Sequence, residues 1–290
     1  MWYIAGTIPE PDLGLEHGLC RVQGQNLLLP SGKSVPIARG TATLVAATTA
    51  ACLALGIDPP AVVLGGDRGK GDGSRLVYQH LIEHCADLHP RGISFHYLFP
   101  DVDWHNRVLL ALQALPVAPV LVADAGFMYV AKMSGYADAY TLFTPDKGEL
   151  AFLADERAPH PFYTRGFLLA VDDDVPALYA RAKQHGNCPA NLLIKSNVDY
   201  IVAAGSIVAQ VDAPCVPAME AIGGTGDLVT ALVTAFLMQG RDVLSASLAA
   251  ARLNRLLAAY VQPTPATQVG ELVQALPELL AQQQENLFVL

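Results

Sequence analysis

Charged residues are scarce in this sequence, and no run of lysine or arginine occurs along it. They make up 16% of the 290 residues, and 18 basic residues against 27 acidic ones give a net charge of -9. Phosphate contacts supply much of the affinity of proteins for nucleic acids, and those contacts need clustered basic side chains. We therefore expect no nucleic acid partner, although backbone amides can still bind a nucleotide locally.

Cysteines are also few, and no Cys-x-x-Cys pair occurs. The five stand far apart, at Cys20, Cys52, Cys85, Cys188 and Cys215. An odd number at wide spacing is typical of reduced, mostly buried thiols, and it argues against a disulfide framework or a zinc site. The N-terminal stretch shows no basic region before an apolar run, so these features together predict a cytoplasmic protein.

Uninterrupted apolar stretches of membrane-spanning length are missing, in spite of a mean hydropathy of +0.33. The segment 41–56 is short and rich in alanine and threonine, and the segment 108–126 is broken by Gln113, Pro116 and Pro119. A transmembrane helix needs about 20 consecutive apolar residues. Buried helices and strands explain the hydropathy better, and we expect no membrane partner.

What the sequence does contain is an alternation of short apolar runs and helical patterns. The patterns predict strands at 61–66, 92–99, 118–126, 139–145 and 191–196, a hairpin at 199–212, and helices at 41–55, 74–88, 104–115, 128–136, 146–155, 175–186 and 244–262. Such alternation is typical of an α/β fold with a mostly parallel sheet and helices on both faces. We expect one domain over residues 1–290, with ligands at the carboxyl ends of the strands.

The segment GGTGD, at 223–227, places three glycines and one acid directly before a long apolar helix. Glycine inside a helix costs about 1 kcal/mol relative to alanine, so helix formation does not explain them. A helix start presents unpaired N–H groups, and glycines let an anion approach these donors. Gly223, Gly224, Thr225 and Gly226 are therefore candidates for an anion hole. Asp227 would repel an anion there, so its useful role is to accept a proton from a hydroxyl; a plain helix cap is the alternative.

This segment and the helix after it, GGTGDLVTALVTAFLMQG, resemble the anion-hole motif of the ribokinase-like superfamily, and most closely its ADP/ATP-dependent NAD(P)H-hydrate dehydratase branch. Three further segments fall in the order of that branch: VLVADAGFM, TLFTPDKGELAFL and LLIKSNVDYIVAAG. The resemblance covers roughly residues 119–259 and is only architectural from about 41 to 99. It implies a three-layer ribokinase-like fold that binds ADP or ATP near Lys195 and the 223–227 turn.

The resemblance also implies a reaction. Asp227 would withdraw the proton of the hydrate hydroxyl, and the terminal phosphate of the nucleotide would pass to that oxygen. Phosphate would then leave and restore the nicotinamide ring. The amides of residues 224–227 would stabilise the negative charge in transit.

Two departures from the pattern of that branch concern the substrate. The dehydratases carry His and Pro where this chain has Asp146 and Lys147, and their Gly-Pro-Gly-Leu-Gly substrate loop is expected after the strand at 92–99, where this chain reads PDVDWHNR. Two alternatives therefore stay open. One is a kinase for a small molecule, such as a sugar or a vitamin precursor, that uses the same Asp227. The other is a nucleotide-binding protein without catalysis.

Charged residues at the expected strand ends are the remaining candidates. Asp146 and Glu149 fall on one helical turn and are predicted to hold a hydrated Mg²⁺; a helix start capped by Thr144 or Asp146 is the alternative. Asp146 is also a candidate substrate contact. Lys195 ends an apolar strand, where it would meet a nucleotide phosphate unless it is an ordinary surface lysine. Asp124 ends another strand, either as a substrate contact or as an acid that fixes a loop.

A second glycine-rich loop, GGDRGKGDG at 65–73, follows an expected strand and should lie on the ligand side of the sheet. Its Asp67 is a candidate contact for a hydroxylated small-molecule substrate, and a flexible surface loop is the alternative. No lid-like insertion is evident before this loop. We therefore expect exposed sheet and helix surface to be covered by a second subunit, as in a homo-oligomer.

Overall fold

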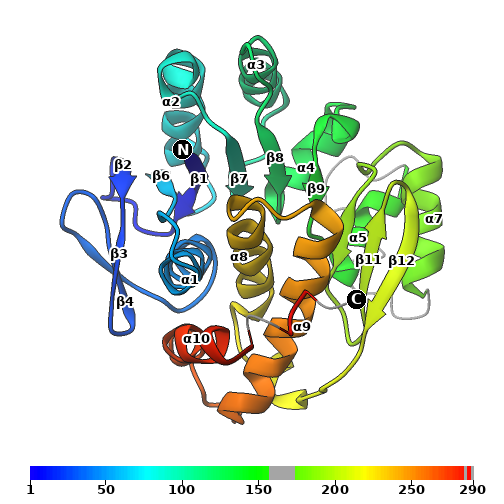
Figure 1. Cartoon of the computed structure of the whole chain (residues 1–290). Helices are drawn as coiled ribbons and strands as arrows, with labels where there is room; N and C mark the ends of the chain where they lie inside the picture. The colour runs from blue at the N-terminus through cyan, green and yellow to red at the C-terminus, as the bar shows by residue number, and fades with distance from the viewer. Residues whose placement is uncertain (157–173, 284–285, 289–290) are drawn as a thin grey trace.

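The computed structural model describes residues 1–156, 174–283 and 286–288, in which a nine-stranded sheet lies between two layers of helices (Figure 1). The strands of this sheet are β1 Trp2–Ile8, β2 Leu15–Leu19, β6 Ala61–Gly66, β7 Gly92–His96, β8 Val120–Ala123, β9 Leu142–Phe143, β10 Leu192–Ile194, β11 Asp199–Ala203 and β12 Ser206–Val211. The helices are α1 Thr41–Ala54, α2 Asp72–Leu88, α3 Val102–Gln113, α4 Gly126–Met133, α5 Lys147–Ala154, α7 Val175–Gln184, α8 Thr225–Met238, α9 Val243–Val261 and α10 Val269–Gln283, with 3-10 turns η1 Ala137–Ala139 and η3 Pro217–Ala221.

The strand order of the large sheet is β12-β11-β10-β9-β8-β7-β1-β6-β2. The six strands from β10 to β6 are parallel, whereas β2, β11 and β12 are antiparallel to their neighbours. The chain passes from β1 to β6 on one side and then to β7 on the other, so the strand order reverses beside β1. A reversal of this kind opens a crevice at the carboxyl ends of the strands. The predicted mostly parallel α/β sheet is confirmed.

Both faces of the sheet are buried under helices. Successive strand residues point to opposite sides, so each strand contributes side chains to both cores. In β1, Ile4 belongs to the core under α1, α8, α9 and α10, whereas Tyr3 and Ala5 belong to the core under α2, α3, α4, α5 and α7. The same alternation holds in β8, where Val122 faces the first core and its two neighbours face the second. The parallel strands therefore read as continuous apolar runs.

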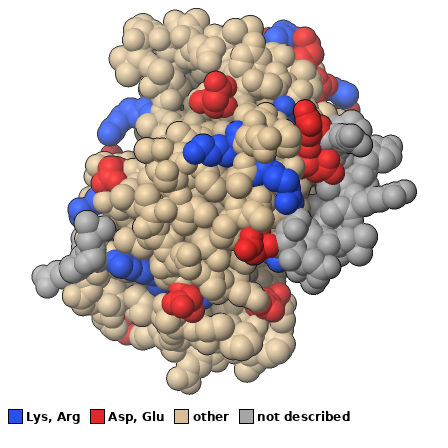
Figure 2. All heavy atoms as spheres, turned by 90° about the vertical axis from the view of Figure 1, so that its right-hand side faces the viewer, with Lys and Arg blue, Asp and Glu red and all other residues tan. Residues whose placement is uncertain are grey.

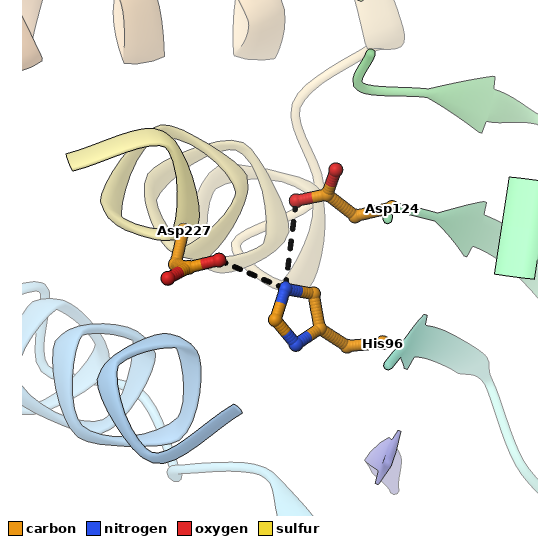
Figure 3. Close-up of side chains that lie close together, drawn as sticks. All are labelled: His96, Asp124 and Asp227. Atoms are coloured by element: carbon orange, nitrogen blue, oxygen red, sulfur yellow. Dashed lines mark hydrogen bonds and ion pairs between the residues drawn. The ribbon is translucent and has the colours of Figure 1, made fainter. Parts of the chain in front are cut away.

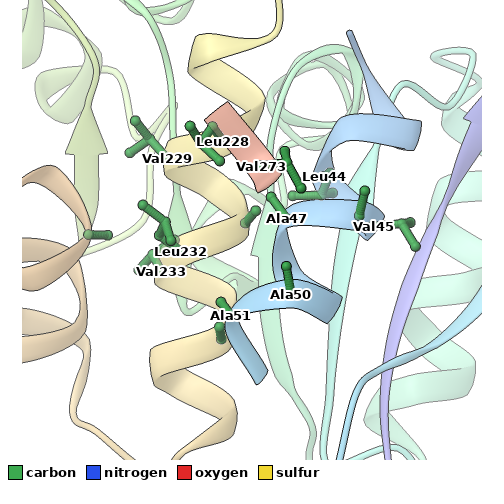
Figure 4. Packing of buried hydrophobic residues seen from close by; sticks show 14 of the residues in the cluster. Leu44, Val45, Ala47, Ala50, Ala51, Leu228, Val229, Leu232, Val233 and Val273 are labelled. Carbon is green, nitrogen blue, oxygen red and sulfur yellow. The ribbon is translucent and has the colours of Figure 1, made fainter. Parts of the chain in front are cut away.

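Helices α1 and α8 pack side by side and form the centre of the first core (Figure 4). Small residues of α1, among them Ala47 and Ala51, let the helix approach Leu232 and Val233 of α8 closely. Twelve of the residues of α1, from Thr41 to Cys52, are buried. An α-helix that is apolar on every side belongs inside a protein or inside a membrane, and here it lies inside the protein.

No helix or strand was predicted in residues 1–40. They nevertheless contain β1, β2 and a small antiparallel sheet of β3 Arg21–Gln23, β4 Asn26–Leu28 and β5 Ser34–Pro36. The small sheet is an insertion before α1, and its Leu27 and Val35 join the first core. Helix α10 was also missed, because Pro277 lies inside it and proline normally interrupts a helix. The single-domain organisation and the second subunit stay predictions.

The second glycine-rich loop is a close junction between β6 and α2. A β-carbon on Gly73 would lie 2.2 Å from the carbonyl oxygen of Gly66, and one on Gly65 would lie 2.3 Å from the carbonyl oxygen of Gly73. Real β-carbons do not approach a backbone oxygen that closely. Glycines are therefore needed here so that the two backbones can touch, whether or not a ligand binds nearby.

We expect Gly73→Ala to destabilise the protein by about 1–3 kcal/mol, because overpacking at this junction forces the backbones apart. Urea unfolding of the purified variant measures the effect. Gly14→Ala is the matched control, since a β-carbon on Gly14 would meet nothing within 4 Å. If the two variants are equally stable, the junction is less tight than the structure shows.

On the face in Figure 2, basic and acidic side chains are interspersed among uncharged ones. Within the described residues, no helix combines the length and the hydropathy that crossing a membrane requires.

Candidate functional site

The carboxyl ends of the parallel strands bring three polar side chains together. His96 is the last residue of β7, Asp124 directly follows β8, and Lys195 directly follows β10. The exposed fractions of their side chains are only 0%, 2% and 11%. Polar groups that are buried this deeply need partners, and they find them in one another and in α8.

Helix α8 begins beside these residues without a side-chain cap from the described part of the chain. Gly224 holds the cap position with a φ of 96°, in the left-handed region. A β-carbon there would also come within 3.0 Å of Val269 Cγ1 and 3.1 Å of Arg39 Cα, so only glycine fits. The first N–H groups of α8 and the positive end of its dipole are therefore available to an anion.

Asp227 lies in the first turn of α8, and both of its carboxylate oxygens have partners. Oδ2 accepts a hydrogen bond from the Gly40 N–H at 2.5 Å, and Oδ1 lies 3.0 Å from His96 Nε2. Burial favours the neutral acid, but the bonds from His96 and Gly40 and the charge of Lys195 outweigh it and lower the pKa of Asp227. The carboxylate is thus ionised at neutral pH, which is the form that accepts a proton.

His96 stands between Asp227 and Asp124 (Figure 3). Its Nε2 is 3.7 Å from Asp124 Oδ2, and its Nδ1 is 2.9 Å from the hydroxyl of Thr41 at the start of α1. Ionised carboxylates only accept hydrogen bonds, so Nε2 must carry a proton. One imidazole thereby links the ends of β7 and β8 to the starts of α1 and α8.

Asp124 is held by a dense set of donors. The Lys195 ammonium lies 2.9 Å and 3.0 Å from its two oxygens, the Thr230 hydroxyl donates at 2.6 Å, and the Ala125 N–H donates at 2.8 Å. Burial works against the ammonium charge, but the carboxylates of Asp124 and Glu149 raise the pKa of Lys195 above its usual range. Asp124 and Lys195 therefore form a buried, charged ion pair.

A metal ion is a second way to interpret the same cluster. Among the described residues, ligand atoms of His96, Asp124 and Asp227 all lie within 4.8 Å of one another, as in a three-ligand metal site. Asp124 is already neutralised by Lys195, and His96 Nε2 needs its proton to bond Asp227. The donors and acceptors of this cluster thus satisfy one another, and no ion is required to explain it.

A pocket of about 410 Å³ opens beside the start of α8 and is bordered by η3, α9 and the loop after β10. Lys195, Thr225, Gly226 and Asp146 line one part of it, and Asn254 of α9 lines another. The Oδ1 atom of Asn254 is buried and finds no hydrogen-bond partner among the described residues. A buried acceptor without a partner costs free energy, and Asn254 is the one of six such side chains among the described residues that lines this pocket.

The family to which such a site belongs follows from comparison with known proteins. The model of the Carb_kinase family, described as NAD(P)H-hydrate dehydratase, matches residues 104–278. The chain belongs to this family. An uncharacterised protein of Methanocaldococcus jannaschii is 36% identical over 220 residues, which cover 76% of this chain and 90% of that relative. Asp124, Lys195 and Asp227 lie inside the matched stretch, whereas Gly40 and His96 precede it.

Solved structures confirm the ribokinase-like fold expected of this dehydratase family. Pyridoxal kinase from Lactobacillus plantarum superposes with a TM-score of 0.58 at 15% identity and covers 98% of both chains. A ribokinase-like superfamily protein from Enterococcus faecalis gives 0.57 at 15% identity, over 97% of this chain and 86% of that one. Phosphofructokinase-2 from Escherichia coli gives 0.51 at 14% identity, over 96% and 98%. Identities this low show the shared fold alone.

In this member of the dehydratase family, Asp146 and Glu149 begin α5 as a reciprocal cap. Glu149 N–H donates to Asp146 Oδ1 at 2.7 Å, and Asp146 N–H donates to Glu149 Oε2 at 2.8 Å. Burial and the charge of Asp146 raise the pKa of Glu149 well above its usual range. The sequence offered Thr144 or Asp146 as the capping residue of this helix, and these hydrogen bonds identify Asp146. Binding of Mg²⁺ by Asp146 and Glu149 stays a prediction.

Asp67 has a structural role that the sequence did not reveal. Its Oδ1 accepts hydrogen bonds from the N–H groups of Gly69, Lys70 and Gly71, and its Oδ2 accepts two from Ser74. Burial opposes these bonds, yet the pKa of Asp67 is lowered by them. The Asp67 carboxylate thus holds its own loop in one conformation through these hydrogen bonds. Contact of Asp67 with a substrate stays a prediction.

Two residues of the site were missed, although the sequence carried a signal for one of them. The predicted strand ran over 92–99, which hid that β7 ends at His96. A histidine that ends a buried parallel strand falls on the ligand edge of the sheet, as Asp124 does. Gly40 gave no signal, because its N–H reaches Asp227 only through the folded chain.

Proposed function

We propose that this chain is an ADP/ATP-dependent NAD(P)H-hydrate dehydratase-like enzyme, with Asp227 as the base and the start of α8 as the anion hole. One observation carries the proposal: an ionised carboxylate, 13% exposed, stands in the first turn of a helix that has no side-chain cap among the described residues, and Thr225 and Gly226 of the same turn line a pocket with Lys195. Membership of the dehydratase family supports it further.

The pocket fits a nucleotide in the chemistry of its lining. Lys195 and the first N–H groups of α8 would hold phosphate oxygens, since both are positive and face the same space. Asn254 Oδ1 would accept a hydrogen bond from an exocyclic amine of the base. When bound, the nucleotide would supply the terminal phosphoryl group for transfer to a hydroxyl.

Asp227 would orient that hydroxyl and take its proton. Each carboxylate oxygen has a second lone pair, so the bonds from Gly40 and His96 leave room for a substrate hydroxyl. The N–H groups at the start of α8 would stabilise the negative charge that develops beside it. Positioning and electrostatics supply most of the catalysis of phosphoryl transfer, so this small set of groups is adequate.

Mg²⁺ would be placed by the start of α5. Asp146 is joined to Lys195 by a β-bridge and lines the pocket, so its carboxylate lies near the predicted phosphates. Glu149 is buried and bonded back to Asp146, so it would act on the ion mainly through Asp146. Hard oxygen ligands and retained waters are the usual shell of this cation.

A kinase for a small alcohol is the second candidate, and the residues after β7 favour it. The dehydratases are expected to carry a glycine-rich substrate loop in place of the segment 100–107, and directly before that segment this chain has Tyr97 and Phe99, with 52% and 38% of their surface exposed. The Tyr97 ring also lies beside Gly40, whose N–H donates to Asp227. Aromatic faces of this kind suit a ring-bearing alcohol such as a vitamin precursor.

Product analysis separates the candidates. The protein would be incubated with ADP or ATP, Mg²⁺ and either hydrated NADH or a panel of sugars and ring-bearing alcohols. Restored NADH fluorescence with free phosphate supports the dehydratase, and a stable phosphorylated alcohol in ³¹P spectra supports the kinase. Nucleotide binding with neither product supports the non-catalytic protein. If no adenine nucleotide raises the thermal stability of the protein, all three are wrong.

Asn254→Ala is expected to weaken ATP binding about tenfold, because one hydrogen bond to the base would be lost, about 1.4 kcal/mol. GTP has no amine at the same ring position, so its affinity should stay within about twofold. Isothermal titration with both nucleotides gives the comparison. Asn26→Ala, an exposed asparagine on β4, is the control. Equal losses for ATP and GTP would mean that Asn254 does not contact the base.

A further inference from the structure

Of His96, Asp124 and Lys195, only His96 lies outside the stretch matched by the family model, 104–278. It is the last residue of β7 and precedes the segment 100–107, which stands in place of the glycine-rich substrate loop expected of the dehydratases. Its side chain is fully buried. A fully buried imidazole at the carboxyl edge of the sheet needs hydrogen-bond partners, and these partners indicate its role.

The backbone around His96 is arranged so that it can reach Thr41. A β-carbon on Gly6 of β1 would lie 2.4 Å from the His96 carbonyl oxygen and 2.8 Å from Thr41 Cγ2. Gly6 therefore leaves the space through which α1 approaches the end of β7. This close approach brings the Thr41 hydroxyl to His96 Nδ1 and the Gly40 N–H to Asp227.

Asp227 therefore receives a hydrogen bond on each carboxylate oxygen, and we call this pair of bonds the Gly40–His96 grip. Gly40 N–H donates to one carboxylate oxygen and His96 Nε2–H donates to the other. The last torsion of an aspartate side chain is broad, so a single bond would leave the carboxylate plane free to turn. Two bonds from opposite sides fix that plane and aim the remaining lone pairs in one direction.

The other partners of His96 hold the imidazole itself. Thr41 fixes Nδ1, Asp124 Oδ2 lies 3.7 Å from Nε2, and the Tyr97 ring meets the imidazole edge to face at 4.5 Å between centroids. Asp124 is in turn neutralised by Lys195. The imidazole therefore has one orientation, and its Nε2–H points to Asp227.

We propose that His96 is a positioning residue for the base: it holds the carboxylate of Asp227 in the orientation that receives the substrate hydroxyl. The inference rests on the proposed function of Asp227. It adds that the Gly40–His96 grip, which the family match does not include, sets the rate of the chemical step rather than the binding of nucleotide.

Three variants test the proposal by separating kcat from KM. His96→Ala removes the donor and should lower kcat about 100-fold, the size of effect expected from a small misplacement of a reacting group, while KM for nucleotide changes less than about threefold. His96→Gln keeps an N–H donor and should recover at least about tenfold of that loss. His105→Gln, a buried histidine bonded to Tyr140 in the other layer, should lower stability but leave kcat unchanged.

Two results would overturn the proposal. One is a folded His96→Ala protein whose kcat stays within about twofold of the parent. The other is a loss that falls on KM alone. Recovery by glutamine is the readout that a purely structural role for the ring would not give, because the two side chains differ in shape but share the donor.

A measurement without turnover keeps this proposal apart from the proposed function. Imidazole ¹⁵N spectra of the ligand-free protein should show the His96 proton on Nε2, and Asp227→Asn should shift that resonance. If the spectra agree but no substrate is turned over, the proposed reaction is wrong and the grip stands. If the proton is on Nδ1, or Asp227→Asn leaves the resonance unmoved, the grip does not exist.

Discussion

Replacing Asp227 with asparagine is expected to lower kcat by about a thousandfold, within the range by which general bases contribute to enzymatic rates. The amide keeps the size and one acceptor oxygen, so the bonds from Gly40 and His96 can partly survive. What it loses is the ability to take a proton from the substrate hydroxyl. Steady-state kinetics on whichever substrate the product analysis identifies give the number.

The affinity for nucleotide should hardly change in Asp227→Asn, and it should rise slightly if it changes at all. The carboxylate stands beside the predicted anion hole, and removal of its charge relieves repulsion of the phosphates. Asp58→Asn is the control, because that acid is exposed and lies just before β6, at the edge of the sheet opposite to the site. A variant that retains more than about a tenth of the parent kcat would show that Asp227 is not the base.

The large features of the fold could be predicted because they leave a local pattern. Buried parallel strands read as continuous apolar runs, and every predicted strand matched one in the sheet. The candidate anion-hole segment could be proposed for the same reason: GGTGD lies within five consecutive residues, and its glycines have no use in an ordinary helix. Local patterns fail where local rules are broken, as at Pro277 inside α10.

The contacts that complete the site could not be predicted, because they join distant parts of the chain. His96 and Asp227 are 131 residues apart, and Gly40 and Asp227 are 187 apart. Only the crossing of α1 over the end of β7 brings them together. Asp146 and Glu149 show the opposite limit, since their spacing fits a cap and a metal site equally well and only the hydrogen bonds identify the cap.

The Lys195–Asp124 pair should give the largest effect on stability. Lys195→Met keeps the length of the side chain and removes its charge, which leaves Asp124, 2% exposed, without its cation. Removal of one partner of a buried ion pair costs about 3–5 kcal/mol. The raised pKa of Lys195 means that the pair contributes fully below pH about 10.4 and weakens only as pH rises through the folded value, so urea unfolding at neutral pH measures the whole effect.

A double-mutant cycle shows whether the loss comes from the uncompensated charge. Asp124→Asn combined with Lys195→Met removes the carboxylate that would otherwise be buried without its cation. The stability lost by the double variant should therefore be clearly smaller than the sum of the two single losses. Arg75→Met is the matched control, because its pair with Asp72 is 50% and 80% exposed and such pairs contribute less than about 1 kcal/mol. Additive losses in the cycle would mean that the two groups do not interact. Lys195 would then be free to serve only the nucleotide, and Asp124 would depend on Thr230 and Ala125 for its stability.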